Sequence, residues 1–362
     1  GSTDDTAMLV QRFVKQHKLR GGIYFSKFVD FATNRNIVIR HINNFTKASH
    51  ILLLDADERF NLRSSIDIKN NDDKKDLLYS ILYDKSDIDV FNLPIEMNGI
   101  SWCNPKLIKN IKSLRYKMPV HEYLNVSDDK HRSFYFNTFQ IDNVNNGPRK
   151  RGGDIDPVIV LNKDVEILIK HLEHLNTLDG SVPDVAFEKL RTNFYIGKSY
   201  EDQADYIGMY TYYNYVLMHS QWDQELFHVS RYSYFAERLL GITHTCNYVD
   251  NMLNLYLNRP HRYEALEDIF AYLNSVGAYT LALTIGRLYV IGQEYQQSSD
   301  VLFVRNKAYI DVLHLLFEMS YKTGNMGDAK RYNDMYRDAC VSGKFLITEE
   351  DRDRIESILK QD

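Results

Sequence analysis

Short apolar runs and helical patterns alternate over the first 142 residues of the chain. Segments 23–25, 51–54 and 89–93 are typical of buried strands. Between the first two, residues 31–43 carry apolar side chains at helical spacing, and Asp30 stands where an N-cap belongs. This alternation predicts an α/β layer with a largely parallel sheet in residues 1–142.

The pattern changes across residues 143–160, where glycine, proline and charged residues predict a linker. Beyond it the strand pattern largely disappears, and residues 161–362 predict an all-α domain of helices interrupted by glycine or proline. Residues 196–200 (Ile-Gly-Lys-Ser-Tyr) fit part of a tetratricopeptide (TPR) unit, whose period is about 34 residues. Segments 276–282 and 322–329 resemble turns between paired helices. Such helix pairs bury their apolar faces by stacking on their neighbours.

Composition restricts the partners and the location of the protein. The formal net charge of −5 argues against nucleic acid as a partner. The three cysteines lie far apart, which favours a reducing compartment and therefore the cytoplasm. Abundant Asn, Asp, Lys, Ile and Tyr are compatible with a large virus as the source. In that case we expect the protein in the cytoplasm of the host cell. No apolar run approaches the roughly 20 residues of a membrane-spanning helix, so we expect no transmembrane segment.

Two acids, Asp55 and Asp57, follow the apolar run 51–54 directly. If the backbone stays extended there, both side chains project to the same side, because side chains of a strand alternate. Two carboxylates at the carboxyl end of a strand can hold a hard divalent cation together with a nucleotide diphosphate. The structural alternative is an acidic end to an ordinary core strand.

Four motifs of the first 123 residues occur in a fixed order. They are Gly-Ser-Thr-Asp-Asp-Thr at 1–6, Asp-Phe-Ala-Thr-Asn-Arg-Asn at 30–36, Leu-Leu-Asp-Ala-Asp-Glu at 53–58 and Val-His-Glu-Tyr at 120–123. In this order they resemble glycosyltransferase family 2, in particular its branch with a TPR-like C-terminal half. The resemblance implies a GT-A (Rossmann-like) catalytic domain. The family has a further strand–helix unit before the first motif, so we expect this domain to lack that unit here.

The resemblance also implies roles for these motifs. Asp57 becomes the direct ligand of Mn²⁺ or Mg²⁺, and Asp55 faces the ribose or the waters of the metal. The cation would neutralise the departing diphosphate. Arg35, whose planar fork of donors suits a uracil edge or a phosphate, lies near the nucleotide together with Asp30. The structural alternatives are that Asp30 caps a helix and that Arg35 is a solvated helix residue.

The fourth motif supplies candidates for the acceptor side. An inverting transferase needs a carboxylate that takes the proton of the acceptor hydroxyl, and Glu122 is the residue we expect in this role. His121 would complete the metal shell or contact a phosphate, since neutral imidazole is a common ligand. A purely structural role for His121 is the open alternative.

The sequence leaves two hypotheses of different class. The first is a metal-dependent inverting glycosyltransferase that moves a sugar from a nucleotide-diphosphate donor, a uridine diphosphate (UDP) sugar, to an unidentified protein or glycan acceptor. Its helical domain would present a concave surface to the acceptor or to a second copy in a homo-oligomer. The second hypothesis is a catalytically silent helical-repeat interaction protein with a relic glycosyltransferase domain.

Overall fold

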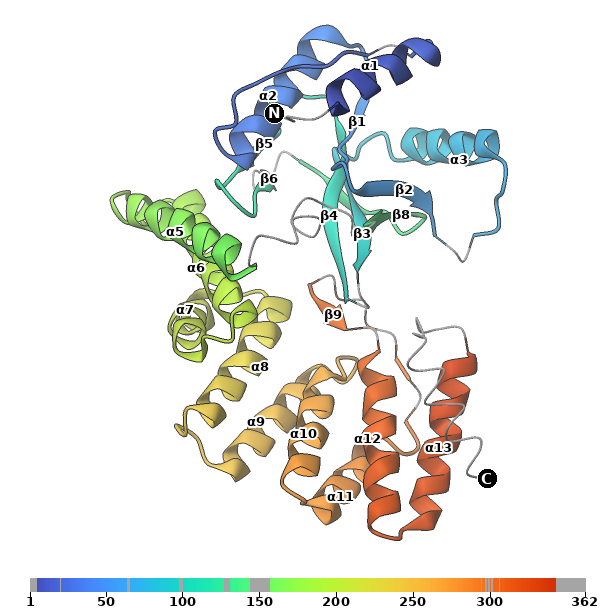
Figure 1. Ribbon diagram of the computed structural model, residues 1–362, viewed down its shortest axis with the longest axis vertical. Coiled ribbons are helices and arrows are strands. Elements are labelled where there is room, and N and C mark those ends of the chain that lie inside the picture. The colour runs from blue at the N-terminus through green and yellow to red at the C-terminus, as the bar shows by residue number, and fades with distance from the viewer. Residues whose placement is uncertain are drawn as a thin grey trace.

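The computed structural model has a mixed α/β region followed by a helical region (Figure 1). The structure describes residues 5–19, 21–63, 66–97, 100–126, 131–143, 157–293, 295–296, 298, 300, 302–305 and 307–342. Most of the motif expected at 1–6 therefore lies outside the described residues, as does the greater part of the expected linker. Helix α5 begins at Pro157, inside the interval expected for that linker.

The α/β region is built on one mixed sheet of seven strands. Its order is β1-β4-β3-β8-β2, with β7 beside β3 and β9 beside β4. The strands are β1 (His50–Leu52), β2 (Glu58–Leu62), β3 (Val90–Met97), β4 (Ile100–Lys109), β7 (Ser133–Tyr135), β8 (Phe139–Asn143) and β9 (Val304–Arg305).

The expectation of a largely parallel sheet is wrong. Only β7 and β8 pair with β3 in parallel among the described strands, and the other four pairs are antiparallel. The physical reason lies in the centre of the sheet, where β3 ends at Met97 and β4 begins at Ile100. Such a short connection can make a hairpin but no crossover between parallel strands.

The described part of this region also contains the helices α1 (Thr6–Gln16), α2 (Phe31–Phe45) and α3 (Asn71–Asp84). The predicted N-cap of α2 is confirmed, because the carboxylate of Asp30 accepts from the backbone N–H of Thr33 at 2.7 Å. The strand expected at 23–25 is wrong. These residues have no regular structure, and Phe25 is 69% exposed. An apolar triplet alone is therefore not sufficient to form a strand.

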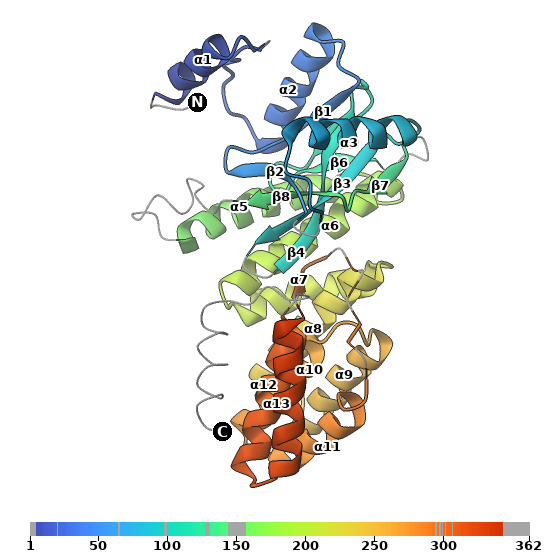
Figure 2. The ribbon, with the colours of Figure 1, turned by 90° about the vertical axis from the view of Figure 1, so that its right-hand side faces the viewer.

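Helices α2 and α3 pack on opposite faces of the sheet. Consecutive residues of β3 point to opposite sides, as in any strand: Val90 joins the apolar cluster that contains Ile39 of α2, whereas Phe91 joins the cluster against which Ile81 of α3 packs. Helix α1 contributes no buried residue and lies away from the sheet in Figure 2. The α2 face is the one that matters for the candidate site.

The helical half consists of successive helices that pack on their neighbours, as the sequence predicts. They are α5 (Pro157–Asn176), α6 (Pro183–Asp202), α7 (Tyr206–His219), α8 (Asp223–Leu239), α9 (Thr245–Asn258), α10 (Glu264–Ser275), α11 (Tyr279–Tyr289), α12 (Ala308–Lys322) and α13 (Met326–Val341). No helix in the described ranges is both long and apolar enough to cross a membrane.

Glycines shape this helical half in two ways. Gly197 permits close packing of α6 on α7, since a Cβ at this position would lie 2.4 Å from Cδ1 of Tyr213. Gly277 and Gly324 follow the ends of α10 and α12 with φ values of 72° and 71°. This left-handed conformation is typical of the residue that ends a helix.

The two halves are in direct contact at two places. The short strand β9 pairs with β4, so a segment that precedes α12 extends the sheet. A separate two-stranded sheet, β5 (Arg115–Lys117) with β6 (Tyr123–Asn125), packs on α5 and α6 through a shared apolar cluster. Figure 1 shows α5 and α6 near β5 and β6. An ion pair between Lys117 and Asp184, 2.9 Å apart, adds to this contact.

Candidate functional site

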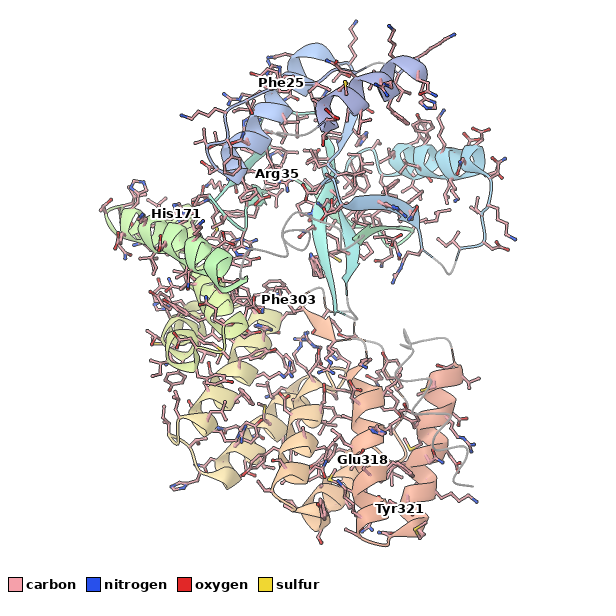
Figure 3. The ribbon with its side chains drawn as sticks, in the orientation of Figure 1. Phe25, Arg35, His171, Phe303, Glu318 and Tyr321 are labelled. Carbon is pink, nitrogen blue, oxygen red and sulfur yellow. The ribbon has the colours of Figure 1, made fainter. Side chains whose placement is uncertain are left out.

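Arg35 brings together Asp55 and Glu122, so that residues of three separate sequence motifs meet. Its Nη2 donates to the two carboxylate oxygens of Asp55 at 2.9 and 3.1 Å, and its Nε donates to Oε1 of Glu122 at 2.5 Å. Figure 3 shows Arg35 at the side of α2 toward the strands. The candidate donor-binding residues Arg35 and Asp55 and the candidate base Glu122 therefore form one ion-paired cluster.

Local structure fixes this arrangement. Asn36, the neighbour of Arg35, clamps α2 to β5 because its side-chain amide bonds both the carbonyl and the N–H of Tyr116, at 2.9 and 2.8 Å. The guanidinium of Arg35 lies 5.5 Å from the centre of the Tyr116 ring, a cation–π contact. The register of α2 on β5 thus sets the position of the guanidinium.

Lys106 of β4 adds a second positive charge next to the cluster. Its Nζ lies 2.7 Å from Oε2 of Glu58 and 3.4 Å from Oδ2 of Asp55. The side chains of Lys106 and Glu58 are 6% and 5% exposed, so this is a buried ion pair, whereas that of Asp55 is 42% exposed. Partial burial alone would raise the pKa of Asp55, but the charges of Lys106 and Arg35 outweigh it and lower that pKa below its ordinary value.

The backbone between the two acids is a turn, and the expected extended geometry is wrong. The carbonyl of Asp55 accepts from the N–H of Glu58 at 3.1 Å, and the N–H of Asp55 donates to Oε2 of Glu58 at 2.9 Å. The strand already ends at Leu52, so the alternation of strand side chains does not apply to Asp55 and Asp57. Asp57 sits in this turn, and within the described part of the chain no residue donates to its carboxylate.

A cavity of about 220 Å³ opens beside the cluster. Arg35, Lys106 and Glu122 line it together with Tyr116 and Tyr123. Pockets that hold a whole small-molecule ligand measure roughly 300–1,000 Å³. The cavity therefore has room for part of a nucleotide sugar, such as the diphosphate and the sugar ring, with the remainder outside it.

The other two candidate residues have structural contacts. Both oxygens of the Asp30 carboxylate bond Thr33, one to its N–H at 2.7 Å and one to its hydroxyl at 2.8 Å, which occupies Asp30 as a helix cap. His121 has a φ of 52°, and its ring stacks on Tyr195 of α6 with centroids 4.2 Å apart. Its ring is thus part of the contact between the two halves.

The acids could supply only part of the coordination shell of a metal ion. Carboxylate oxygens are suitable ligands for Mn²⁺ or Mg²⁺, and Asp57 is available for this role. Across the described residues, however, no group of three His, Cys, Asp or Glu side chains is placed to hold a metal. A cation at Asp57 and Asp55 would therefore share its coordination with phosphate oxygens of a ligand and with water, as Mg²⁺ commonly does.

Comparisons with known proteins add little to this geometry. No protein-family model matches the chain, and no curated protein matches it. A solved structure of a Podosopora anserina protein assigned as a kinesin light chain, with nearly identical TPR-like repeats, is similar with a TM-score of 0.36 and 12% identity. The match covers 52% of this chain and 88% of that one. At this level of similarity it carries no argument about function.

Two residues of the site were not predicted from the sequence. Lys106 interrupts the apolar pattern of β4 next to Leu107 and Ile108, and a buried charge in such a strand indicates a buried partner. Arg191 of α6 also lines the cavity. Nothing in the local sequence marks it, because the packing of one half on the other brings it there.

Proposed function

We propose that the chain is an inverting glycosyltransferase that uses a nucleotide-diphosphate sugar, in particular a UDP sugar. The observation that supports this most is the meeting of Arg35, Asp55 and Glu122 beside one cavity, although they lie in three separate sequence motifs. The resemblance of these motifs to glycosyltransferase family 2 supplies the class of donor. The acceptor is a hydroxyl of a protein or glycan that the helical half helps to bind.

The proposed reaction assigns a task to each member of the cluster. Arg35 and Lys106 attract the negative charge of the diphosphate, which competes with Asp55 and Glu122 for the guanidinium. Glu122, released as a carboxylate, takes the proton of the acceptor hydroxyl while the oxygen attacks the anomeric carbon. The bond from that carbon to the diphosphate breaks, and the nucleoside diphosphate leaves with the electron pair. A cation bound at Asp57 would stabilise the charge of this leaving group.

An assay of UDP release from a panel of UDP sugars, with Mn²⁺ or Mg²⁺ present, tests the proposal. Glu122→Gln should lower the turnover about 10²- to 10⁴-fold, the usual contribution of a general base. Asp57→Ala should weaken the dependence on the cation. Asp87→Asn is the control, because this exposed acid pairs with Arg132 and does not line the cavity. Unchanged turnover in both the Glu122 and the Asp57 variants would contradict the proposed mechanism.

The second candidate function is an interaction protein with a silent α/β region. The observation in its favour is that Arg35 occupies both Asp55 and Glu122, so the candidate base is already paired. Thermal unfolding separates the two functions. UDP with Mn²⁺ should raise the melting temperature of a donor-binding protein by mass action, whereas a protein without a donor site should show no shift.

A further inference from the structure

Arg191 of α6 belongs to the helical half, yet it forms part of the wall of the cavity with Arg35, Lys106 and Glu122. The three basic side chains of this wall differ in one respect. Arg35 is paired with Asp55 and Glu122, and Lys106 is paired with Glu58. No described carboxylate forms an ion pair with Arg191. Burial raises the pKa of Glu225 above its ordinary value, and the positive charge of Arg191 opposes this shift without outweighing it.

The charge balance makes this difference important. Arg35 and Lys106 face three carboxylates, those of Asp55, Glu58 and Glu122, so these five groups together carry a net negative charge. An anion that enters the cavity is repelled by that set unless a further positive charge compensates it. Arg191 is the lining residue that supplies this charge.

Aromatic rings hold the Arg191 guanidinium in place. Its carbon Cζ lies 4.8 Å from the centres of both the Tyr123 ring and the Tyr195 ring, and its Nη2 donates to the Tyr195 hydroxyl at 3.2 Å. Its Nε is buried without an acceptor, and no described residue accepts from its Nη1. Cation–π contacts position a guanidinium without using its charge in an ion pair, which leaves it able to bind an anion.

We infer that Arg191 binds the diphosphate of the nucleotide sugar, so that the helical half completes the donor site. This inference rests on the proposed function and deepens it. It makes the contact between the halves part of the site itself, because Tyr123 comes from β6 and Tyr195 from α6. The ligand chemistry is that of a phosphate, recognised by the planar fork of donors of an arginine.

Isothermal titration of the full chain with UDP and with uridine, each in the presence of Mn²⁺, tests the inference. Arg191→Gln should weaken UDP binding about 10- to 100-fold, the usual effect of one charge-assisted hydrogen bond, and leave uridine binding unchanged. Arg191→Lys keeps the charge and should lose less affinity than Arg191→Gln. Arg287→Gln is the matched control, because Arg287 lies on α11 and pairs with Asp328.

The outcomes separate the inference from the proposed function. If the wild-type chain binds UDP and Arg191→Gln binds it equally well, the inference is wrong and the proposed function stands. If the wild-type chain does not bind UDP at all, the proposed function is wrong, and the inference that rests on it is wrong as well. A loss of both UDP and uridine binding in Arg191→Gln, with an unchanged melting temperature, would assign Arg191 to the nucleoside and overturn the assignment to the diphosphate. Equal losses in Arg191→Lys and Arg191→Gln would contradict a role based on charge.

Discussion

The buried ion pair between Lys106 and Glu58 allows a quantitative test of the structure beneath the candidate site. Their charged atoms lie 2.7 Å apart, and both side chains are nearly inaccessible to solvent. Removal of one partner of such a pair leaves an uncompensated buried charge, which costs about 3–5 kcal/mol of folding free energy. Lys106→Met should reach this range, because among the described residues Glu58 then keeps only the N–H of Asp55 as a donor. Glu58→Met should fall at its lower end, because Lys106 keeps Asp55 at 3.4 Å.

The double variant distinguishes an ion pair from simple packing. Replacement of a buried pair by apolar side chains of similar volume is often close to neutral, so Lys106→Met with Glu58→Met together should lie within about 1–2 kcal/mol of the wild type. The coupling energy of the cycle should then be at least about 4 kcal/mol. As the control, the exposed pair Arg132–Asp87 should show a much smaller coupling.

Urea unfolding followed by tryptophan fluorescence measures these differences. Trp102 lies on β4 with Lys106, whereas Trp222 lies in the helical half, so a Trp222→Phe background reports the sheet alone. The midpoint should shift while the slope with urea stays constant. Losses below about 1 kcal/mol in both single variants would refute the burial of this pair.

Three further predictions concern the helical half and the cation at Asp57. Gly197→Ala should cost about 1–3 kcal/mol, because its Cβ would overlap the Tyr213 ring, and calorimetry should show a lower melting temperature than for Gly327→Ala, whose Cβ would meet Oδ1 of Asn325 only at 4.0 Å. Burial would raise the pKa of Glu201, but His228, Lys198 and the Tyr213 hydroxyl stabilise its carboxylate and lower that pKa to about 2. Its contribution to stability is therefore complete above its unfolded pKa near 4.5 and is lost as the pH falls toward 2, so Glu201→Gln should show a shallower loss of stability in acid. Removal of divalent cations with a chelator should lower UDP affinity in the wild type and have less effect in Asp57→Ala, as measured by titration.

The fold was predictable from the sequence wherever local patterns determine it. Asp30 followed by helical spacing gave the start of α2, and the glycines near 277 and 324 gave the ends of α10 and α12, because caps depend on residues a few positions apart. The sheet was less predictable. The antiparallel hairpin of β3 and β4 depends on which strands pair, and the apolar pattern does not contain this information.

The candidate site was likewise predictable only in part. The motifs indicated Arg35, Asp55 and Glu122, and the structure places these three side chains together. The turn at Asp55 was missed because Glu58 ties the backbone through its own side chain, a contact that strand alternation does not anticipate. Arg191 could not be predicted, since only the packing of α6 on β6 brings it to the cavity.

A crystal structure of the chain with UDP and Mn²⁺ tests the central claim most directly. The account predicts a nucleotide whose diphosphate oxygens lie about 3 Å from the guanidinium of Arg35, with the bond from Arg35 to Glu122 broken. A nucleotide bound elsewhere, or a cavity without nucleotide at saturating UDP and an intact Arg35–Asp55–Glu122 cluster, would contradict it.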